Sequence, residues 1–107
     1  MFEKELDLER WPDAKVRVRM FNSIQVTDIG RAINTKPGLG LPLSGVDLDR
    51  YFRAAVVSFE NAPQLNKETV SGGPDSNCDY VLPQFMFEVI MGAMSYSQVT
   101  EEEAKNS

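Results

Sequence analysis

Six consecutive residues, Ser71-Gly72-Gly73-Pro74-Asp75-Ser76, have the types and the order that could bind a phosphate group. Glycines let backbone amides approach an anion closely, and successive amides in such a loop form an anion-binding concavity. In phosphate sites of this kind a strand leads into the loop and a helix starts directly after it. The residues on either side of the run therefore decide whether it is a binding site.

The run resembles the signature loop of the ATP pyrophosphatase superfamily, Ser-Gly-Gly-x-Asp-Ser, with Pro74 at the variable position. The resemblance implies ATP binding at the first strand of a parallel sheet. The context differs, because residues 65–70 are mostly polar and Pro83 delays any following helix. Only 31 residues follow the run, too few for the remaining strand–helix units of about 30 residues each. We interpret the run as a plain loop and expect no catalytic residue, cofactor or metal.

Cys78 is the only cysteine, and the chain has no histidine. Without histidine, the common zinc sites and every triad with a histidine base are excluded. A lone cysteine cannot form an internal disulfide, and with no histidine to deprotonate it we regard Cys78 as a passive thiol. An oxygen-only site for magnesium or calcium stays open, since carboxylates are plentiful.

The charge is distributed unevenly along the 107 residues. Residues 1–59 carry nine basic and eight acidic side chains, a net +1, whereas residues 60–107 carry two and eight, a net −6. Nucleic-acid binding usually needs a dense basic face, so we do not expect nucleic acid to be a main partner. We also expect no membrane partner, because no apolar run approaches the ~20 residues of a spanning helix.

The composition and pattern predict a small single domain of α+β class covering residues 1–107. Residues 15–21 alternate apolar and basic side chains, which predicts a half-buried strand. Its three like charges suggest an edge strand, or one that faces an acidic partner, or simply a solvated face. Residues 1–10 are compatible with a short helix, and residues 23–34 could form another.

Two main helices are predicted at about 46–60 and 80–96, where apolar residues recur at helical spacing. The stretch 54–59 is rich enough in β-branched and aromatic residues to be a strand instead. The polar residues 64–78 are expected to form a flexible loop, and about 99–107 an acidic tail or a short capped helix.

Three groups of residues are candidates for contact with a partner. The second predicted helix is apolar on more than one side, the segment 36–43 alternates leucines with glycines and prolines, and the strand at 15–21 is basic. The candidates are Phe85, Phe87, Met91 and Met94 on the helix, Leu39, Leu41 and Leu43 on the loop arm, and Arg17 and Arg19 on the strand.

The order of elements resembles small assembly proteins of tailed bacteriophages, such as tail assembly chaperones and minor virion proteins. The likeness rests on the basic alternating stretch at 11–19, the segment 56–61, and the apolar helix with its acidic end at 99–107. It implies a non-enzymatic protein that binds itself or other phage structural proteins, in the host cytoplasm or in the virion.

Two other function classes stay open at this point. One is a small acidic regulator that inhibits a host enzyme by mimicking nucleic acid, since the second half of the chain is acidic. The other is a nucleotide-binding enzyme that uses the loop at 71–76.

Overall fold

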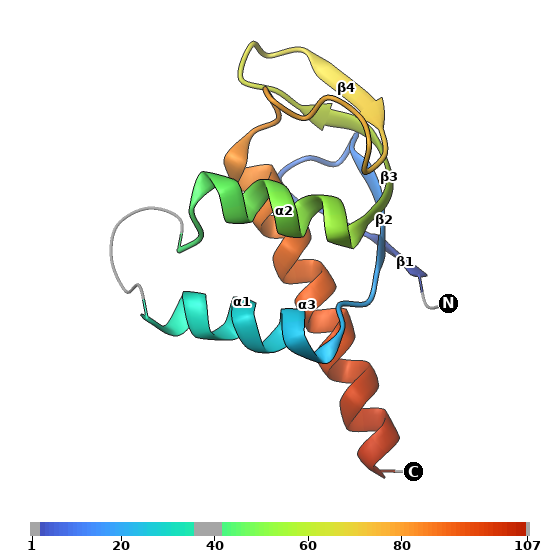
Figure 1. Cartoon of the computed structure of the whole chain (residues 1–107). Coiled ribbons are helices and arrows are strands. Elements are labelled where there is room, and N and C mark those ends of the chain that lie inside the picture. Colours follow the sequence, from blue (N-terminus) through green and yellow to red (C-terminus); the bar gives the residue numbers. More distant parts are fainter. Residues whose placement is uncertain (1–2, 36–41, 107) are drawn as a thin grey trace.

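The computed structural model describes residues 3–35 and 42–106, which form an antiparallel sheet and three helices. The elements in chain order are β1 (Glu3–Leu6), β2 (Lys15–Arg19), α1 (Ser23–Thr35), α2 (Gly45–Ala55), β3 (Val56–Pro63), β4 (Thr69–Gly72) and α3 (Pro83–Asn106). The strands lie in the sheet in chain order, and α1 and α2 both come between β2 and β3 (Figure 1). The predicted α+β class is confirmed.

β2 is a half-buried strand, as its alternation predicts, since Val16 and Val18 are fully buried. The expectation that it lies at a sheet edge is wrong, because β2 pairs with β1 on one side and with β3 on the other. Its exposed cations lie opposite carboxylates of both neighbours, which reduces the repulsion between like charges. The acidic partner of the basic strand is therefore within the sheet.

Residues 3–6 form a strand, whereas the sequence suggested that the first ten residues were compatible with a helix. β1 pairs with β2 along its whole length, and Leu6 at its end is buried in the core. Gly92 of α3 lies directly against Leu6, so that a Cβ built there would come within 2.7 Å of a leucine methyl group. Burial against α3 and strand pairing thus outweigh the weak local preference of this charged segment.

Both internal helices begin with a side-chain cap. Asn22 and Gln25 cap each other's backbone N–H groups at the start of α1, each over 2.9 Å. Ser44 caps α2 by accepting a 3.2 Å hydrogen bond from the Asp47 N–H.

The second half of the chain differs from the expected boundaries. α2 ends at Ala55 rather than near residue 60. The alternative of a strand at 54–59 is confirmed from Val56 onward, whereas residues 54 and 55 belong to α2. The expected loop at 64–78 contains β4, which forms a hairpin with β3. α3 continues to Asn106, so the backbone of the expected tail is helical.

The core lies between the sheet and the two helices α2 and α3, which pack on one face of the sheet (Figure 1). Phe52 of α2 is fully buried, and its ring centroid lies 5.8 Å from Phe59 of β3 and 6.3 Å from Phe85 of α3. These three rings join both helices to the sheet. Such aromatic pairs add to the stabilisation that burial itself provides.

Ser97 on α3 is a buried polar residue with a definite structural role, and its replacement is our first prediction. Its Oγ accepts a 2.9 Å hydrogen bond from the Phe21 N–H and donates a 2.7 Å bond to the Ala93 carbonyl. Ser97→Ala would leave the Phe21 amide without that acceptor, so we expect a loss of about 1–3 kcal/mol in the free energy of unfolding. Urea unfolding measures this loss.

The exposed neighbour Ser95 provides the matched control on the same helix. Ser95→Ala should change the free energy of unfolding by no more than about 0.5 kcal/mol. Equal effects of the two substitutions would contradict the role assigned to the Ser97 hydroxyl.

Candidate functional site

The run at 71–76 folds into a tight turn that uses its own polar groups. The Ser76 N–H donates to the Gly73 carbonyl over 3.1 Å, which closes a β-turn with Pro74 at its favoured second position. The Ser76 Oγ accepts a 2.9 Å hydrogen bond from the Gly73 N–H. The Ser71 Oγ accepts a 3.1 Å hydrogen bond from the Asn61 N–H. Asn61 has a φ of 57°, which marks an irregularity in β3.

Gly72 is required by the packing of this turn. A Cβ at this position would lie 2.2 Å from the Ser76 Oγ and 2.7 Å from the Ser76 Cβ. Any side chain there would push Ser76 away and break the bond that its hydroxyl accepts. The small and hydroxyl residues that resemble a phosphate loop thus have a role in the local fold.

Arg53 of α2 holds the same turn in place. Its Nη1 donates to the carbonyls of Pro74 and Ser76, over 2.7 and 2.9 Å. Its Nε bonds both carboxylate oxygens of Asp49, over 3.0 and 3.1 Å, and this hydrogen bonding raises the pKa of the Arg53 guanidinium further above its usual range. One side chain therefore ties the segment between β4 and α3 to helix α2.

Cys78 lies next to this connection and is buried, with 2% of its surface exposed. Burial raises the pKa of its thiol, and the nearby Arg53 charge offsets part of that rise. The Sγ atom donates weakly to the Ser76 carbonyl over 3.5 Å. A thiol whose pKa is raised is a poor nucleophile at neutral pH.

The surroundings of the turn differ from those of a phosphate loop. β4, which leads into it, is an edge strand of an antiparallel sheet, and its residues are exposed or half-buried. The next helix, α3, begins only at Pro83. No helix N-terminus therefore follows the turn directly, whereas phosphate loops use such an N-terminus to bind the anion.

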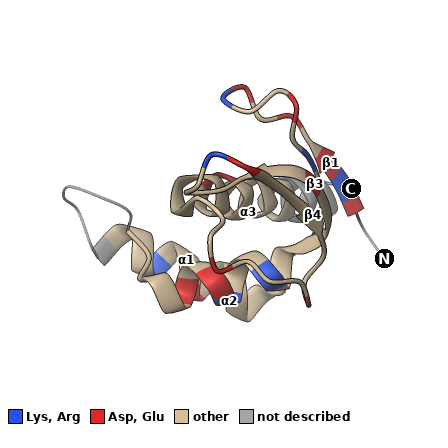
Figure 2. Cartoon of the chain, turned by 90° about the horizontal axis from the view of Figure 1, so that it is seen from above, with Lys and Arg blue, Asp and Glu red and all other residues tan. Residues whose placement is uncertain are grey.

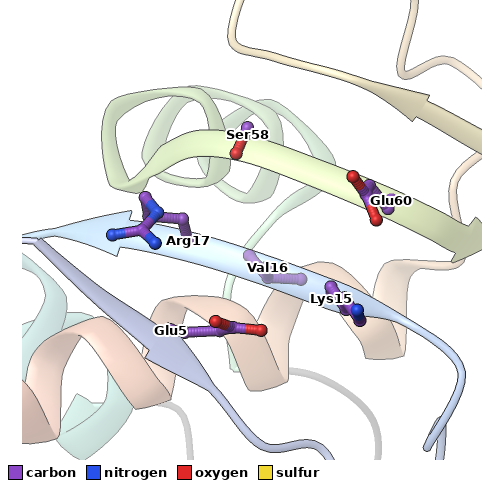
Figure 3. Close-up of a pocket in the computed structure, with 6 residues that line it drawn as sticks. All are labelled: Glu5, Lys15, Val16, Arg17, Ser58 and Glu60. Atoms are coloured by element: carbon purple, nitrogen blue, oxygen red, sulfur yellow. The ribbon is translucent and has the colours of Figure 1, made fainter.

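A shallow hollow of about 230 Å³ lies on the face of the sheet opposite the helices (Figure 3). Its charged lining residues come from three adjacent strands: Glu5 from β1, Lys15 and Arg17 from β2, and Glu60 from β3. Strand pairing sets cations against carboxylates here, and acidic and basic segments lie side by side on the strands (Figure 2). This balance favours neither an anion nor a cation.

The two predicted arginines belong to this outer face. Arg17 lies opposite Glu5 and forms a 3.8 Å ion pair with Glu3, so its charge is partly compensated within the sheet. Arg19 is half-buried opposite Glu3, and its Nε has no hydrogen-bond partner among the described residues.

The apolar candidates divide into three sets. Phe85, Met94 and Leu43 are buried in the core, with at most 4% of their surfaces exposed, so in this fold a partner cannot reach them. Phe87 and Met91 are half-buried on α3. Leu39 and Leu41 lie outside the described residues.

A second hollow, of about 430 Å³, lies between the first turn of α2 and the segment that leads into α3. Apolar side chains dominate its lining, including Val46, Val81 and Met86. Val46 is 78% exposed at its border. Two more exposed apolar residues, Tyr80 and Leu65, belong to the adjoining segments. Tyr80 directly precedes Val81, and the Tyr80 carbonyl accepts a 2.8 Å hydrogen bond from the Leu65 N–H.

We use the term apolar end for the hollow together with three exposed apolar residues of the segments around it: Val46 in its lining, Tyr80 between the lining residues Asp79 and Val81, and Leu65, whose N–H bonds to the Tyr80 carbonyl. Sequence reasoning missed it, because these residues belong to no periodic stripe and come from three separate segments. The sequence feature that could have identified them is their position in a turn or in the first turn of a helix. A large apolar side chain at such a position is seldom needed for the core. In Figure 1 the start of α2 lies beside the start of α3, and the β3–β4 turn lies above them.

No helix in the described part of the chain combines the length and hydrophobicity that crossing a bilayer requires. Residues 3–34 and 42–98, whose side chains are described, contain no group of three or more cysteine or carboxylate side chains placed to hold a metal ion.

Comparison of the chain with protein-family models, with curated proteins and with solved structures gives no match.

Proposed function

We propose that this protein is non-enzymatic and acts by binding another protein through its apolar end. The observation that carries the proposal is an apolar hollow with exposed apolar residues on the segments around it. Four large apolar residues are exposed in the described part of the chain, and three of them, Val46, Leu65 and Tyr80, belong to the apolar end. Isolated apolar residues are normal on a surface, whereas several around an apolar hollow are typical of a protein-binding site.

The internal bonding of the turn at 71–76 supports the non-enzymatic part of the proposal. Its amide, hydroxyl and carbonyl groups bond to one another and to Arg53. Binding of a nucleotide there would have to break these bonds. Calorimetry with ATP and magnesium tests this point, and measurable heat of binding would contradict it.

The biological setting that we propose is the assembly or structure of a bacteriophage particle. Its support is the likeness in element order described above. The partner would then be another phage structural protein or a second copy of the chain, in the host cytoplasm or in the particle. The alternative, an acidic inhibitor of a host enzyme, would bind by charge and lose affinity steeply as salt rises.

The test is to mix the purified protein with candidate phage structural proteins and to measure complexes by size-exclusion chromatography with light scattering. We expect a complex that persists at high salt and that the double variant Val46→Ser, Tyr80→Ser abolishes. Ile24→Ser on α1 is the matched control, because Ile24 is the fourth exposed apolar residue and lies outside the apolar end. A complex that survives the double variant, or that salt dissociates, would contradict the proposal, as would the lack of any complex.

A further inference from the structure

The hollow of the apolar end has a floor that the domain itself keeps rigid. Leu48 of α2, Val81, and Met86 of α3 line it, and each is at least 94% buried. Their positions are set by the packing of α2 against α3. The volume of about 430 Å³ lies toward the lower end of the range of ligand pockets, about 300–1,000 Å³. The hollow is therefore suited to one large apolar side chain rather than to an extended segment.

The charges that line this hollow have one sign. Asp49 and Asp79 are the only charged residues in its lining, in contrast to the balanced outer face of the sheet. The Asp49 carboxylate is bonded to Arg53 and thereby compensated. Asp79 is exposed and forms no ion pair with residues 3–34 and 42–98, whose side chains the structure describes.

The first turn of α2 also borders the hollow, and the positive end of a helix dipole would favour an anion. That effect is reduced here in two ways. The Ser44 Oγ accepts a hydrogen bond from the Asp47 N–H, so this amide is already satisfied. The Asp47 carboxylate lies within the first turn and offsets the positive end of the dipole. The carboxylate at the hollow that has no direct ion pair among the described side chains is therefore that of Asp79, and the Arg53 charge acts on it only from a longer distance.

From this arrangement we infer that the hollow receives an apolar side chain with a cationic group beside it, presented by the partner protein. The apolar part fills the space over Leu48, Val81 and Met86, and the cation pairs with the Asp79 carboxylate. This inference rests on the proposed function, because it specifies the partner of the same end of the molecule. It excludes an acidic partner segment, which Asp79 would repel.

Two small probes with the same apolar body and opposite charges test the inference on the full chain. 4-Phenylbutylamine carries an ammonium group and 4-phenylbutyrate a carboxylate. We expect ¹H–¹⁵N spectra to show saturable shifts at residues 45–49 and 78–86 with the amine. The carboxylate should bind there about two- to fivefold more weakly, the difference that one exposed ion pair can produce. Equal affinities, or shifts confined to other surfaces, would overturn the inference.

The variant Asp79→Asn isolates the role of the charge. It should remove the preference for the amine and leave the affinity for the carboxylate unchanged or improved. Asp75→Asn is the control, because Asp75 is an exposed carboxylate of the same connection that does not line the hollow. Loss of the preference in both variants, or in neither, would overturn the assignment to Asp79.

Failure of this inference can be told apart from failure of the proposed function. If the probes discriminate but the double variant leaves every complex intact, the function is wrong and the chemistry of the hollow stands. If the double variant abolishes the complexes but the two probes bind equally well, the proposed function stands and the inference about the hollow is wrong. Sedimentation velocity of the protein alone shows whether the partner is a second copy, and a dimer that Val46→Ser dissociates but Asp79→Asn leaves intact would overturn the inference.

Discussion

Replacing Phe52 with alanine is expected to lower the free energy of unfolding by about 3–5 kcal/mol. The ring is fully buried and lies against Phe59 and Phe85, so its removal leaves a cavity between α2, β3 and α3. The free energy of unfolding of a small domain is about 5–15 kcal/mol in total, so this one substitution removes a large part of the stability. Urea unfolding followed by circular dichroism measures the change.

Phe87 provides a control of the same residue type. It is half-buried at the margin of the core, and Phe87→Ala should lower the stability by clearly less than Phe52→Ala. If the two substitutions had equal effects, Phe52 would not be at the centre of the core, and the packing described here would be wrong.

Arg53→Ala is expected to destabilise the protein by about 2–3 kcal/mol, the range of charge-assisted hydrogen bonds that lose their donor. The Pro74 and Ser76 carbonyls would lose the only hydrogen bonds that link them to α2 among the described residues. Arg53→Lys should recover only part of the loss, because an ammonium group cannot reproduce the planar fork that reaches Asp49 and both carbonyls. Chemical unfolding gives the loss, and faster amide exchange at residues 73–76 gives its location.

Arg50→Ala separates this effect from the simple loss of a cation on α2. Arg50 forms an exposed ion pair with Asp47, and its side chain is 63% exposed. Its guanidinium also lies over the Tyr51 ring, 4.7 Å from the ring centroid. Exposed interactions of these kinds contribute about 1 kcal/mol or less. An Arg53→Ala effect no larger than that of Arg50→Ala would show that the turn does not depend on Arg53.

The class of the fold was predictable from the sequence, but the position of strands within the sheet was not. The alternation at 15–21 identifies a strand from local information alone, since side chains of a strand point to opposite faces. Whether that strand is at an edge depends on which segments pair with it. The charged segment at β1 has little strand signal of its own, and it becomes a strand because β2 and α3 bind it.

The boundary at Ala55 shows a different limit. Helical spacing continues through Val56 and Phe59, so the pattern extended the predicted helix too far. In the structure Val56 is already in β3, and its N–H donates to the Phe52 carbonyl as the last bond of α2. The β-branched residues at 56–57 prefer a strand, and pairing with β2 decides the outcome.

The candidate site was less predictable than the fold. The hollow requires α2 and the segment before α3 to meet, although more than twenty residues separate them in sequence. Local patterns do not report such a meeting. The loop at 71–76 carried the strongest local signal. The contact of Ser71 with Asn61 and those of Ser76 with Gly72 and Gly73 explain these residues, and the sequence does not reveal those contacts.

The unequal connections of the sheet have a consequence for folding kinetics. The β1–β2 and β3–β4 hairpins join neighbouring segments, whereas pairing of β2 with β3 must close a loop over residues 20–55. Closing a longer loop costs more chain entropy, and contacts between distant residues slow folding. We therefore expect the pairing of β2 with β3 to limit the folding rate. Substitutions at the contact between β2 and β3 should slow folding more than substitutions at the β1–β2 or β3–β4 contact.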